Sequence, residues 1–262
     1  MNEQCEIHTY WNGQANLGLA AGTRDLIAKE LEIEAISKYA KDGIRVLDAG
    51  CGNGITAIEI ASRFDVAMEG FDFAEEMIME AKTKTANSKL KGSVNFQVAD
   101  IRNTPKNLGY FELIYTERAL INLRNWPEQK NAIAGLCRLL VDGGLYVMCE
   151  NSQDGLDRVN LLRENLGIRK IDPPWHNRYF LDAEIEQCMM PGIELERVEH
   201  FTSTYHLLSR VINAWLAEQE GSEPDYNAPV NQLALHLPPI GDLGQTKIWL
   251  WRKVNSSCHH FN

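Results

Sequence analysis

Apolar residues along the chain alternate between short β-rich runs and longer segments with helical spacing. Strands are predicted for seven short runs: 44–49, 67–72, 94–99, 111–116, 145–150, 193–201 and 247–252. Helices are predicted for the longer segments: 23–40, 54–63, 74–87, 127–141, 156–166 and 205–218. Thr23 stands at the N-cap position of the first helix, and Asp142-Gly143-Gly144 closes the helix that ends at residue 141.

Strands that alternate with helices predict βαβ units, and hence an α/β fold with a mostly parallel, doubly wound sheet. The end of the chain departs from this alternation. The gap between the last two predicted strands holds a helix and a Pro/Gly-rich loop over 221–244. Ligands of such sheets bind at the carboxyl ends of the strands. If strand 193–201 runs parallel to its neighbours, the insertion over 203–245 is therefore expected to form a lid over the site.

The composition is that of an ordinary globular protein. The 262 residues are 44% apolar and 24% charged, which suits one domain that buries its own core. Thirty-six acidic residues against 26 basic ones give a net charge of −10, and so acidic a surface repels a phosphate backbone. We therefore expect no nucleic-acid partner.

Signals that the sequence lacks indicate its cellular compartment. No apolar run is long enough to cross a bilayer, and the N-terminus lacks the basic start and apolar stretch of a signal peptide. Six cysteines without a C-x-x-C pair indicate reduced thiols. These features predict a cytoplasmic protein without a membrane partner. The tail Cys258-His259-His260 could bind a soft metal, but a terminal polar tract is more often a frayed end, so no metal is predicted.

The clearest chemical signal is a strand that opens through glycines into a helix. Asp48 precedes a loop that contains Gly50, Gly52 and Gly54. Glycines let the backbone approach a ligand closely, and the helix N-terminus supplies free N–H donors. A dinucleotide-binding loop needs a third glycine, which falls at Ile55 and is absent. A carboxylate at position 48 would repel a pyrophosphate, but it accepts hydrogen bonds from an amine, directly or through water.

This loop and the motifs that follow it resemble the class I S-adenosylmethionine-dependent methyltransferases over roughly residues 40–155. Asp72, Asp100-Ile101 and Thr116-Glu117-Arg118 end successive predicted strands, and residues 139–144 resemble the family's turn into strand five. The resemblance implies a Rossmann-like sheet of seven strands with an antiparallel last strand. It also implies S-adenosyl-L-methionine as cofactor and S-adenosyl-L-homocysteine as product.

The resemblance assigns roles to individual residues. Asp72 is expected to bind both ribose hydroxyls, Asp100 the adenine amine and Ile101 the adenine ring, whereas Cys51 is a small loop filler. The expected cofactor-binding residues are Asp48, Gly50, Cys51, Gly52, Gly54, Asp72, Phe73, Met77, Asp100, Ile101 and Thr116. N-terminal helices of this family often close over the cofactor, so Arg24 or Tyr10 is expected at the methionine carboxylate. A plain helix cap with an exposed arginine is the alternative.

The same reading divides the single domain, 1–262, into a helical cap (1–40), a cofactor-binding half (41–155) and an acceptor-side half (156–262) with the lid. Polar residues beyond the fifth predicted strand are candidates for the acceptor site. His176 is the candidate general base, because an imidazole titrates near neutral pH. Glu117 and Glu150, both at strand ends, are alternative bases.

The expected acceptor-binding residues are Arg118, Glu150, Trp175, Asn177, Arg178, Tyr179, Tyr205 and Arg210. The alternative interpretation of the loop over 175–179 is an exposed turn with a stacked Trp. Small-molecule members of the family often carry a histidine after strand four, where this chain has Asn122. No proton-handling role is therefore drawn from that position.

The acceptor itself is predicted from a looser resemblance to methyltransferases of bacterial surface-polysaccharide pathways, carried by residues 117–123, the Trp-His-Asn loop and residues 238–244. This resemblance predicts O-methylation of a hydroxyl on a nucleotide-activated or glycan sugar. The alternative within the class is O- or N-methylation of another small natural product.

Three other interpretations were weighed. Asp172-Pro173-Pro174-Trp175 has the form of the D-P-P-aromatic motif of amino methyltransferases. In that family the motif must follow strand four, whereas here it lies beyond strand five, so the prolines are expected to stop a helix and stiffen a loop. A nicotinamide oxidoreductase and a non-catalytic cofactor-binding protein are the alternatives from other classes.

Overall fold

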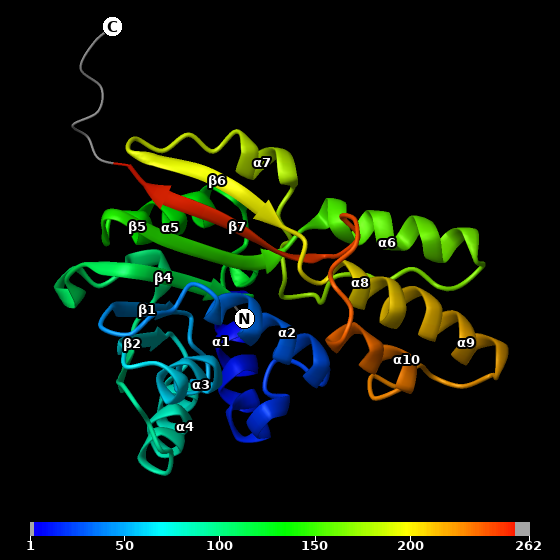
Figure 1. The fold of residues 1–262 in the computed structure, drawn as a ribbon, viewed down its shortest axis with the longest axis horizontal. Coiled ribbons are helices and arrows are strands. Elements are labelled where there is room, and N and C mark those ends of the chain that lie inside the picture. Colours follow the sequence, from blue (N-terminus) through cyan, green and yellow to red (C-terminus); the bar gives the residue numbers. More distant parts are fainter. Residues whose placement is uncertain (1–2, 255–262) are drawn as a thin grey trace, which may run out of the picture.

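A computed structural model describes residues 3–254 and arranges them as a sheet covered by helices on both faces (Figure 1). The strand order is β3-β2-β1-β4-β5-β7-β6, with β1 to β5 parallel and β7 antiparallel to both of its neighbours. The strands are β1 (Arg45–Ala49), β2 (Ala67–Asp72), β3 (Ser93–Val98), β4 (Phe111–Glu117), β5 (Leu140–Asn151), β6 (Ile193–Glu199) and β7 (Thr246–Lys253). The predicted doubly wound sheet of seven strands is confirmed.

The helices of the described chain alternate with these strands. They are α1 (Glu3–Gln14), α2 (Leu26–Ser37), α3 (Ile55–Arg63), α4 (Glu75–Ala86), α5 (Trp126–Cys137), α6 (Gln153–Asn165), α7 (Asp182–Glu186), α8 (Ser203–His206), α9 (Asn213–Gln219) and α10 (Pro229–Gln232). Within residues 3–254, no helix combines the length and the apolar character needed to span a bilayer.

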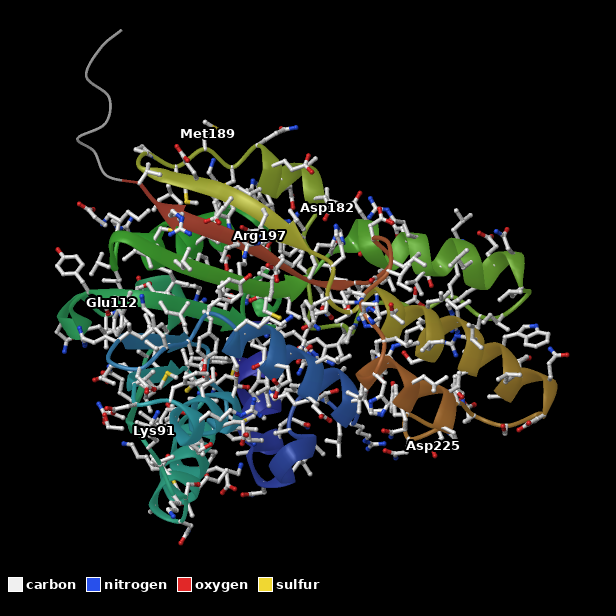
Figure 2. All side chains as sticks on the ribbon, viewed as in Figure 1. Lys91, Glu112, Asp182, Met189, Arg197 and Asp225 are labelled. Atoms are coloured by element: carbon white, nitrogen blue, oxygen red, sulfur yellow. The ribbon has the colours of Figure 1, made fainter. Side chains whose placement is uncertain are left out.

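Successive residues of the strands point to opposite faces, so the sheet has a core on each side. Val46 packs with residues of α2, α3 and α4, whereas its neighbour Leu47 packs with residues of α5 and α6. Charged side chains such as Lys91, Glu112 and Arg197 lie on the outside of these layers (Figure 2).

Two predicted helix boundaries were wrong. The N-cap of α2 is Asp25 rather than Thr23, because the Asp25 carboxylate accepts the Ala28 N–H at 3.0 Å. Thr23 instead accepts the Asp25 N–H through its hydroxyl at 3.1 Å. The helix predicted to reach residue 141 ends at Cys137, since residues 140–144 already belong to β5 and form an irregular pairing with β4.

The predicted lid leaves the sheet at the ligand edge. β7 is antiparallel to both β5 and β6, so β6 runs in the same direction as β1–β5. The carboxyl end of β6 therefore lies at the same edge of the sheet as theirs. The segment between β6 and β7 then forms α8, a π-helical turn (Leu207–Ile212), α9 and α10 before it returns as β7. Figure 1 shows these helices beyond the carboxyl end of β5.

Candidate active site

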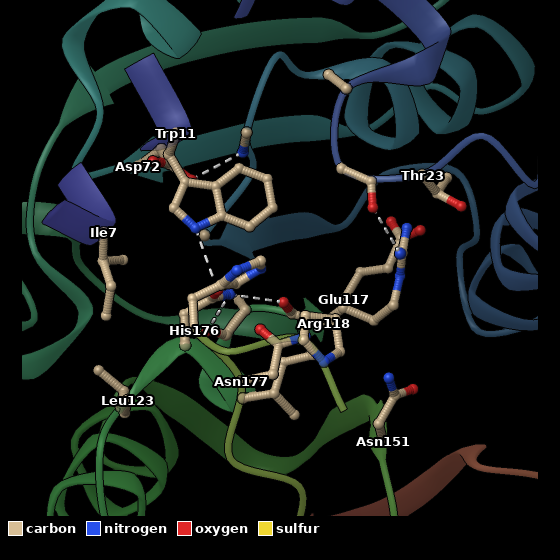
Figure 3. Close-up of a pocket in the computed structure, with 18 of the residues that line it drawn as sticks. Ile7, Trp11, Thr23, Asp72, Glu117, Arg118, Leu123, Asn151, His176 and Asn177 are labelled. Carbon is tan, nitrogen blue, oxygen red and sulfur yellow. Dashed lines mark hydrogen bonds between the residues drawn. The ribbon is translucent and has the colours of Figure 1, made fainter. Parts of the chain in front are cut away.

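A cavity of about 440 Å³ lies at the carboxyl edge of the sheet, a size that suits a small-molecule ligand (Figure 3). Its two ends come from different parts of the sheet edge. One end, the glycine-loop lobe, follows β1, β2 and β3 and contains Gly50, Cys51, Gly52, Asp72, Phe73, Met77, Asp100 and Ile101. The other end, the lid lobe, follows β4 and β5 and includes the lid: Arg118, Asn151, Tyr179, His206, Arg210, Tyr226, Gln245 and Thr246.

The glycine loop can take only glycine at its tightest position. Gly50 has φ +82°, and a Cβ there would lie 2.4 Å from the Cβ of Ala119. Gly52 faces open space, with no atom within 4 Å of the position of a Cβ. Gly54 is the N-cap of α3 and packs against Phe96 rather than lining the cavity, so its expected contact with the cofactor does not appear.

Two buried aspartates stand beside this loop. Asp72 accepts the backbone N–H of Gly52 at Oδ2 and of Ala74 at Oδ1, both at 2.9 Å, and burial raises its pKa. Each of its carboxylate oxygens keeps a further lone pair for a ligand hydroxyl. Asp48 accepts the Tyr115 hydroxyl at 2.7 Å, and burial raises the Asp48 pKa to about 8. Both carboxyl groups therefore line the cavity at the positions that the sequence indicated.

Asp100 also lines the cavity, but its carboxylate is already engaged. Arg102 donates to it from its backbone N–H and from its guanidinium, with Nε–Oδ1 at 2.9 Å. Burial alone would raise the pKa of Asp100, but the hydrogen bonds from Arg102 outweigh it and lower the pKa. A ligand amine at this position shares Asp100 with an arginine, which the sequence did not indicate.

Four ionisable side chains form a buried cluster between α2, α3 and the end of β4. Lys29 donates to Glu117 at 2.6 Å and to Thr56 at 2.8 Å, while Thr56 donates to the second oxygen of Glu117 at 2.5 Å. Glu32 contacts Arg118, with Nε–Oε1 at 3.1 Å. Arg118 is the non-glycine residue with a positive φ (51°) in the described chain.

The two acids of this cluster have pKa values shifted in opposite directions. Burial works to raise the pKa of Glu117, but Lys29 and the other partners lower it to about 2. Burial raises the pKa of Glu32 to about 8. A carboxylate whose two oxygens are both hydrogen-bonded, to Lys29 and Thr56, is a poor proton acceptor. Glu117 therefore lines the cavity as a paired counter-ion, and this geometry favours His176 over Glu117 as the base.

His176 lies on the cavity wall between aromatic rings from the first helix. Its ring centroid is 4.5 Å from that of Tyr10 and 5.7 Å from that of Trp11. Its Nδ1 is buried and has no hydrogen-bond partner, and burial lowers its pKa. Trp11 donates from Nε1 to Asn122 at 3.1 Å, so the residue that replaces the family's histidine holds α1 over the cavity (Figure 3).

Three residues expected at the site, Thr116, Glu150 and Arg24, do not line the cavity. Thr116 is buried, with its hydroxyl 3.0 Å from that of Tyr146. Glu150 accepts the backbone N–H groups of residues 119–121, and burial raises its pKa to about 7. It therefore shapes the loop after β4 rather than contacting an acceptor. Arg24 is exposed, so at this position the plain helix-cap alternative fits better.

Three further expected acceptor residues also lie off the cavity. Trp175 is 59% exposed, Arg178 is paired with Glu184, and Tyr205 donates to Asp25 beneath the lid. By contrast, the cavity lining includes the expected residues Tyr10, Arg118, His176, Asn177, Tyr179 and Arg210. The tail 258–260 lies outside the described residues.

His206 belongs to a polar cluster over 203–210 that the sequence indicated as a possible acceptor site. Sequence reasoning missed several other cavity residues, which are Lys29, Glu32, Asn151, Tyr226, Gln245 and Thr246. Lys29 and Glu32 lie on a helix whose inner face was assigned to the core. Asn151 follows directly after the predicted fifth strand, and the strand-end rule could have found it. The lid residues had no such signal, because their placement depends on how the insertion folds back.

Comparisons with known proteins agree with this geometry. Residues 46–144 match the family model described as a methyltransferase domain. The 27-O-demethylrifamycin SV methyltransferase of Amycolatopsis mediterranei is 30% identical over 139 residues, 52% of this chain and 47% of that protein. The ubiquinone/menaquinone biosynthesis C-methyltransferase UbiE of Geotalea daltonii is 35% identical over 117 residues, 44% of this chain and 48% of that protein. The matches thus span about half the length of these curated relatives.

Solved structures share the fold over nearly the whole chain. Magnesium protoporphyrin IX methyltransferase (ChlM) from Synechocystis PCC 6803, crystallised with bound SAH, has a TM-score of 0.61 at 15% identity, over 95% of this chain and 99% of that chain. The family match over residues 46–144 and the shared fold agree with the resemblance to class I S-adenosylmethionine-dependent methyltransferases that the motif order predicted. The matched family model is that of a methyltransferase, which counts against the nicotinamide oxidoreductase alternative.

Proposed function

We propose that the chain binds S-adenosyl-L-methionine and transfers its methyl group to a hydroxyl oxygen of a polar small molecule, with a sugar hydroxyl on a nucleotide-activated or glycan sugar as the favoured acceptor. The observation that carries the proposal is the continuity of the cavity. It runs from the glycine loop, past His176, to a second lobe lined by polar side chains. One cavity can therefore hold a methyl donor and an acceptor side by side.

The glycine-loop lobe fits the donor. Gly52 leaves the open space that a bound nucleoside fills, and Asp72 offers free lone pairs at the end of β2 for two ribose hydroxyls. Asp48 presents a carboxyl group to an amine, and Phe73, Met77 and Ile101 supply apolar wall for the adenine. When bound, S-adenosyl-L-methionine supplies an activated sulfonium methyl group, which an acceptor oxygen attacks in line.

The chain's own residues then position the acceptor and take its proton. Most of the rate gain in such a displacement comes from holding the two reactants in line. His176 is neutral at pH 7, because burial lowers its pKa, and its buried Nδ1 has no protein partner. It is therefore the group best suited to accept the hydroxyl proton during or after attack.

The lid lobe favours a polar acceptor over an apolar one. Its residues include two arginines and two tyrosines, whereas apolar residues such as Ile121, Leu123 and Ile171 line other parts of the same cavity. The arginines and tyrosines are suited to hydrogen-bond a polar acceptor. O-methylation of another natural product is the second candidate, favoured by the rifamycin-methylating relative.

The test is release of S-adenosyl-L-homocysteine by the full chain across nucleotide sugars, small phenols, amines and carboxylates. We expect turnover with a nucleotide sugar and none with simple phenols or amines. Turnover confined to a phenol or an amine would overturn the sugar acceptor and keep the methyltransferase. Tight cofactor binding without turnover on any acceptor would favour the non-catalytic alternative.

A further inference from the structure

The lid lobe has an excess of hydrogen-bond donors over acceptors. His206 is 2% exposed and lines the cavity. Its Nδ1 lies 3.1 Å from the Thr202 hydroxyl oxygen and accepts the backbone N–H of Gln245 at 3.1 Å, and this backbone donor assigns the proton of the neutral ring to Nε2. No residue of the described chain accepts from Nε2. His206 is therefore fixed as a donor.

The neighbouring side chains of Asn151 and Tyr179 are also oriented as hydrogen-bond donors towards the cavity. Asn151, 4% exposed, accepts the Thr246 hydroxyl at Oδ1 (2.8 Å), so its amide nitrogen is the group that donates. The hydroxyl oxygen of Tyr179 receives a long contact of 3.5 Å from Gln245 Nε2, and the side chains of Asn151 and Asn177 also lie within hydrogen-bonding reach of it. One N–H of the Asn151 amide is thus shared with Tyr179, and the other is left for a ligand. With its oxygen used as an acceptor, the Tyr179 hydroxyl hydrogen remains available to a ligand.

Two guanidinium groups complete the lobe. Arg118 donates to the Gly22 carbonyl at 3.2 Å and contacts Glu32, and Arg210 pairs with Asp25 at 2.5 Å. Each guanidinium carries five N–H donors, so both keep unused ones. The buried Oδ1 of Asn177, next to His176, is an acceptor without a hydrogen-bond partner among the described residues.

We infer that the lid lobe binds an oxyanion substituent of the acceptor, a carboxylate or a phosphate, while Asn177 accepts from a hydroxyl on the same molecule. Charge-assisted hydrogen bonds to arginine and a ring of neutral donors are the partners that an oxyanion requires. A neutral polyol would need as many acceptors as donors, and these side chains do not provide them. The inference rests on the proposed function, because it names a property of the same acceptor.

The experiment uses the full chain saturated with S-adenosyl-L-homocysteine, titrated with sodium acetate, sodium phosphate or sodium chloride at constant ionic strength and followed by NMR chemical shifts. Acetate or phosphate is expected to bind at least about ten times more tightly than chloride, and the preferred anion distinguishes a carboxylate from a phosphate. Asn151→Asp is expected to weaken that binding at least tenfold, since it places a negative charge among the donors. The matched control, Arg63→Gln, removes one surface positive charge and should leave the affinity unchanged.

Equal binding of chloride and the oxyanions, or unchanged affinity in Asn151→Asp, would overturn the inference. If Asn151→Asp does not fold, Tyr179→Phe removes a single hydroxyl donor, and unchanged affinity there has the same consequence. Binding of S-adenosyl-L-homocysteine is measured first. A chain that fails to bind it contradicts the proposed function, whereas a chain that binds it without preferring an oxyanion contradicts only the inference.

Discussion

At the scale of single residues, burial decides which titratable groups can exchange protons. Lys29 lowers the pKa of Glu117, whereas burial raises the pKa of Glu32, one helical turn further along α2. His176 carries no such partner. The sequence could place all three residues near strand ends or helices, but it could not show which carboxylates would be paired, because Lys29 and Glu117 are 88 residues apart.

The role of His176 can be tested by its removal. His176→Ala is expected to lower kcat by about 100-fold or more, because loss of a general base costs about 10²- to 10⁴-fold. Affinity for S-adenosyl-L-homocysteine should hold. Because burial lowers the His176 pKa, the fall of wild-type kcat towards acid pH should lie at a lower pH than an ordinary histidine would give. Measured pH profiles should show that the acid limb is missing in the variant.

A control histidine is available in the lid. His236 is exposed and lies outside the cavity lining, so His236→Ala should keep both kcat and the acid limb. If His176→Ala kept the kcat of wild type, the assignment of His176 as the base would be contradicted.

The raised pKa of Asp48 leads to a prediction about the stability of the chain without ligand. Its pKa is raised to about 8, so the folded chain holds a proton that the unfolded chain releases near pH 4. Stability from this group is therefore present at acid pH and lost as the pH rises towards 8. Asp48→Asn has no proton to lose, and it should gain at least about 1 kcal/mol relative to wild type between pH 5 and pH 8.

Thermal unfolding of both chains at the two pH values measures this difference. Asp142→Asn, at an exposed position of β5, is the matched control and should show no such change. If the difference in melting temperature between wild type and Asp48→Asn were the same at pH 5 and pH 8, the raised pKa of Asp48 would be contradicted.

At the scale of elements, the first helix shows what a pattern cannot predict. α1 has no regular apolar face, and no individual helix was predicted there. Contacts from outside hold it in place: Trp11 bonds Asn122, and the carbonyl of Gly18, just after α1, accepts from Asn53 of the glycine loop at 2.8 Å. By contrast, the bounds of α3 and β2 were predicted almost to the residue. α3 packs on the sheet and β2 belongs to it, so burial sets the apolar spacing of both.

This helix should control how fast the cofactor leaves. Trp11→Phe keeps an aromatic ring but removes the hydrogen bond to Asn122, worth about 1 kcal/mol. We expect the dissociation rate of S-adenosyl-L-homocysteine, measured by stopped flow, to rise about fivefold. Thr9→Val changes a hydroxyl that bonds only within α1, and it should leave the rate as it is. Equal rates in wild type and Trp11→Phe would show that α1 does not gate the site.

At the scale of the whole molecule, the sheet was predictable and the lid was only partly so. Alternation of strands and helices determines a doubly wound fold, and the motif order gave the strand positions at which Asp48 and Asp72 stand. The two-lobed cavity was not predictable, because its second lobe joins Asn151, His206 and Thr246 across long stretches of chain. Only the return of the lid into β7 brings these residues together.

The position of β7 between β5 and β6 has a consequence for synthesis on the ribosome. β6 emerges first, yet it has no partner in the sheet until β7 has been made, and β7 comes only after the entire lid. Until then the edge of β5 stays open and unpaired, which invites association with other nascent chains. The nascent protein can thus assemble its cofactor half early, while the acceptor half waits for one late strand to join β5, β6 and the lid in a single event.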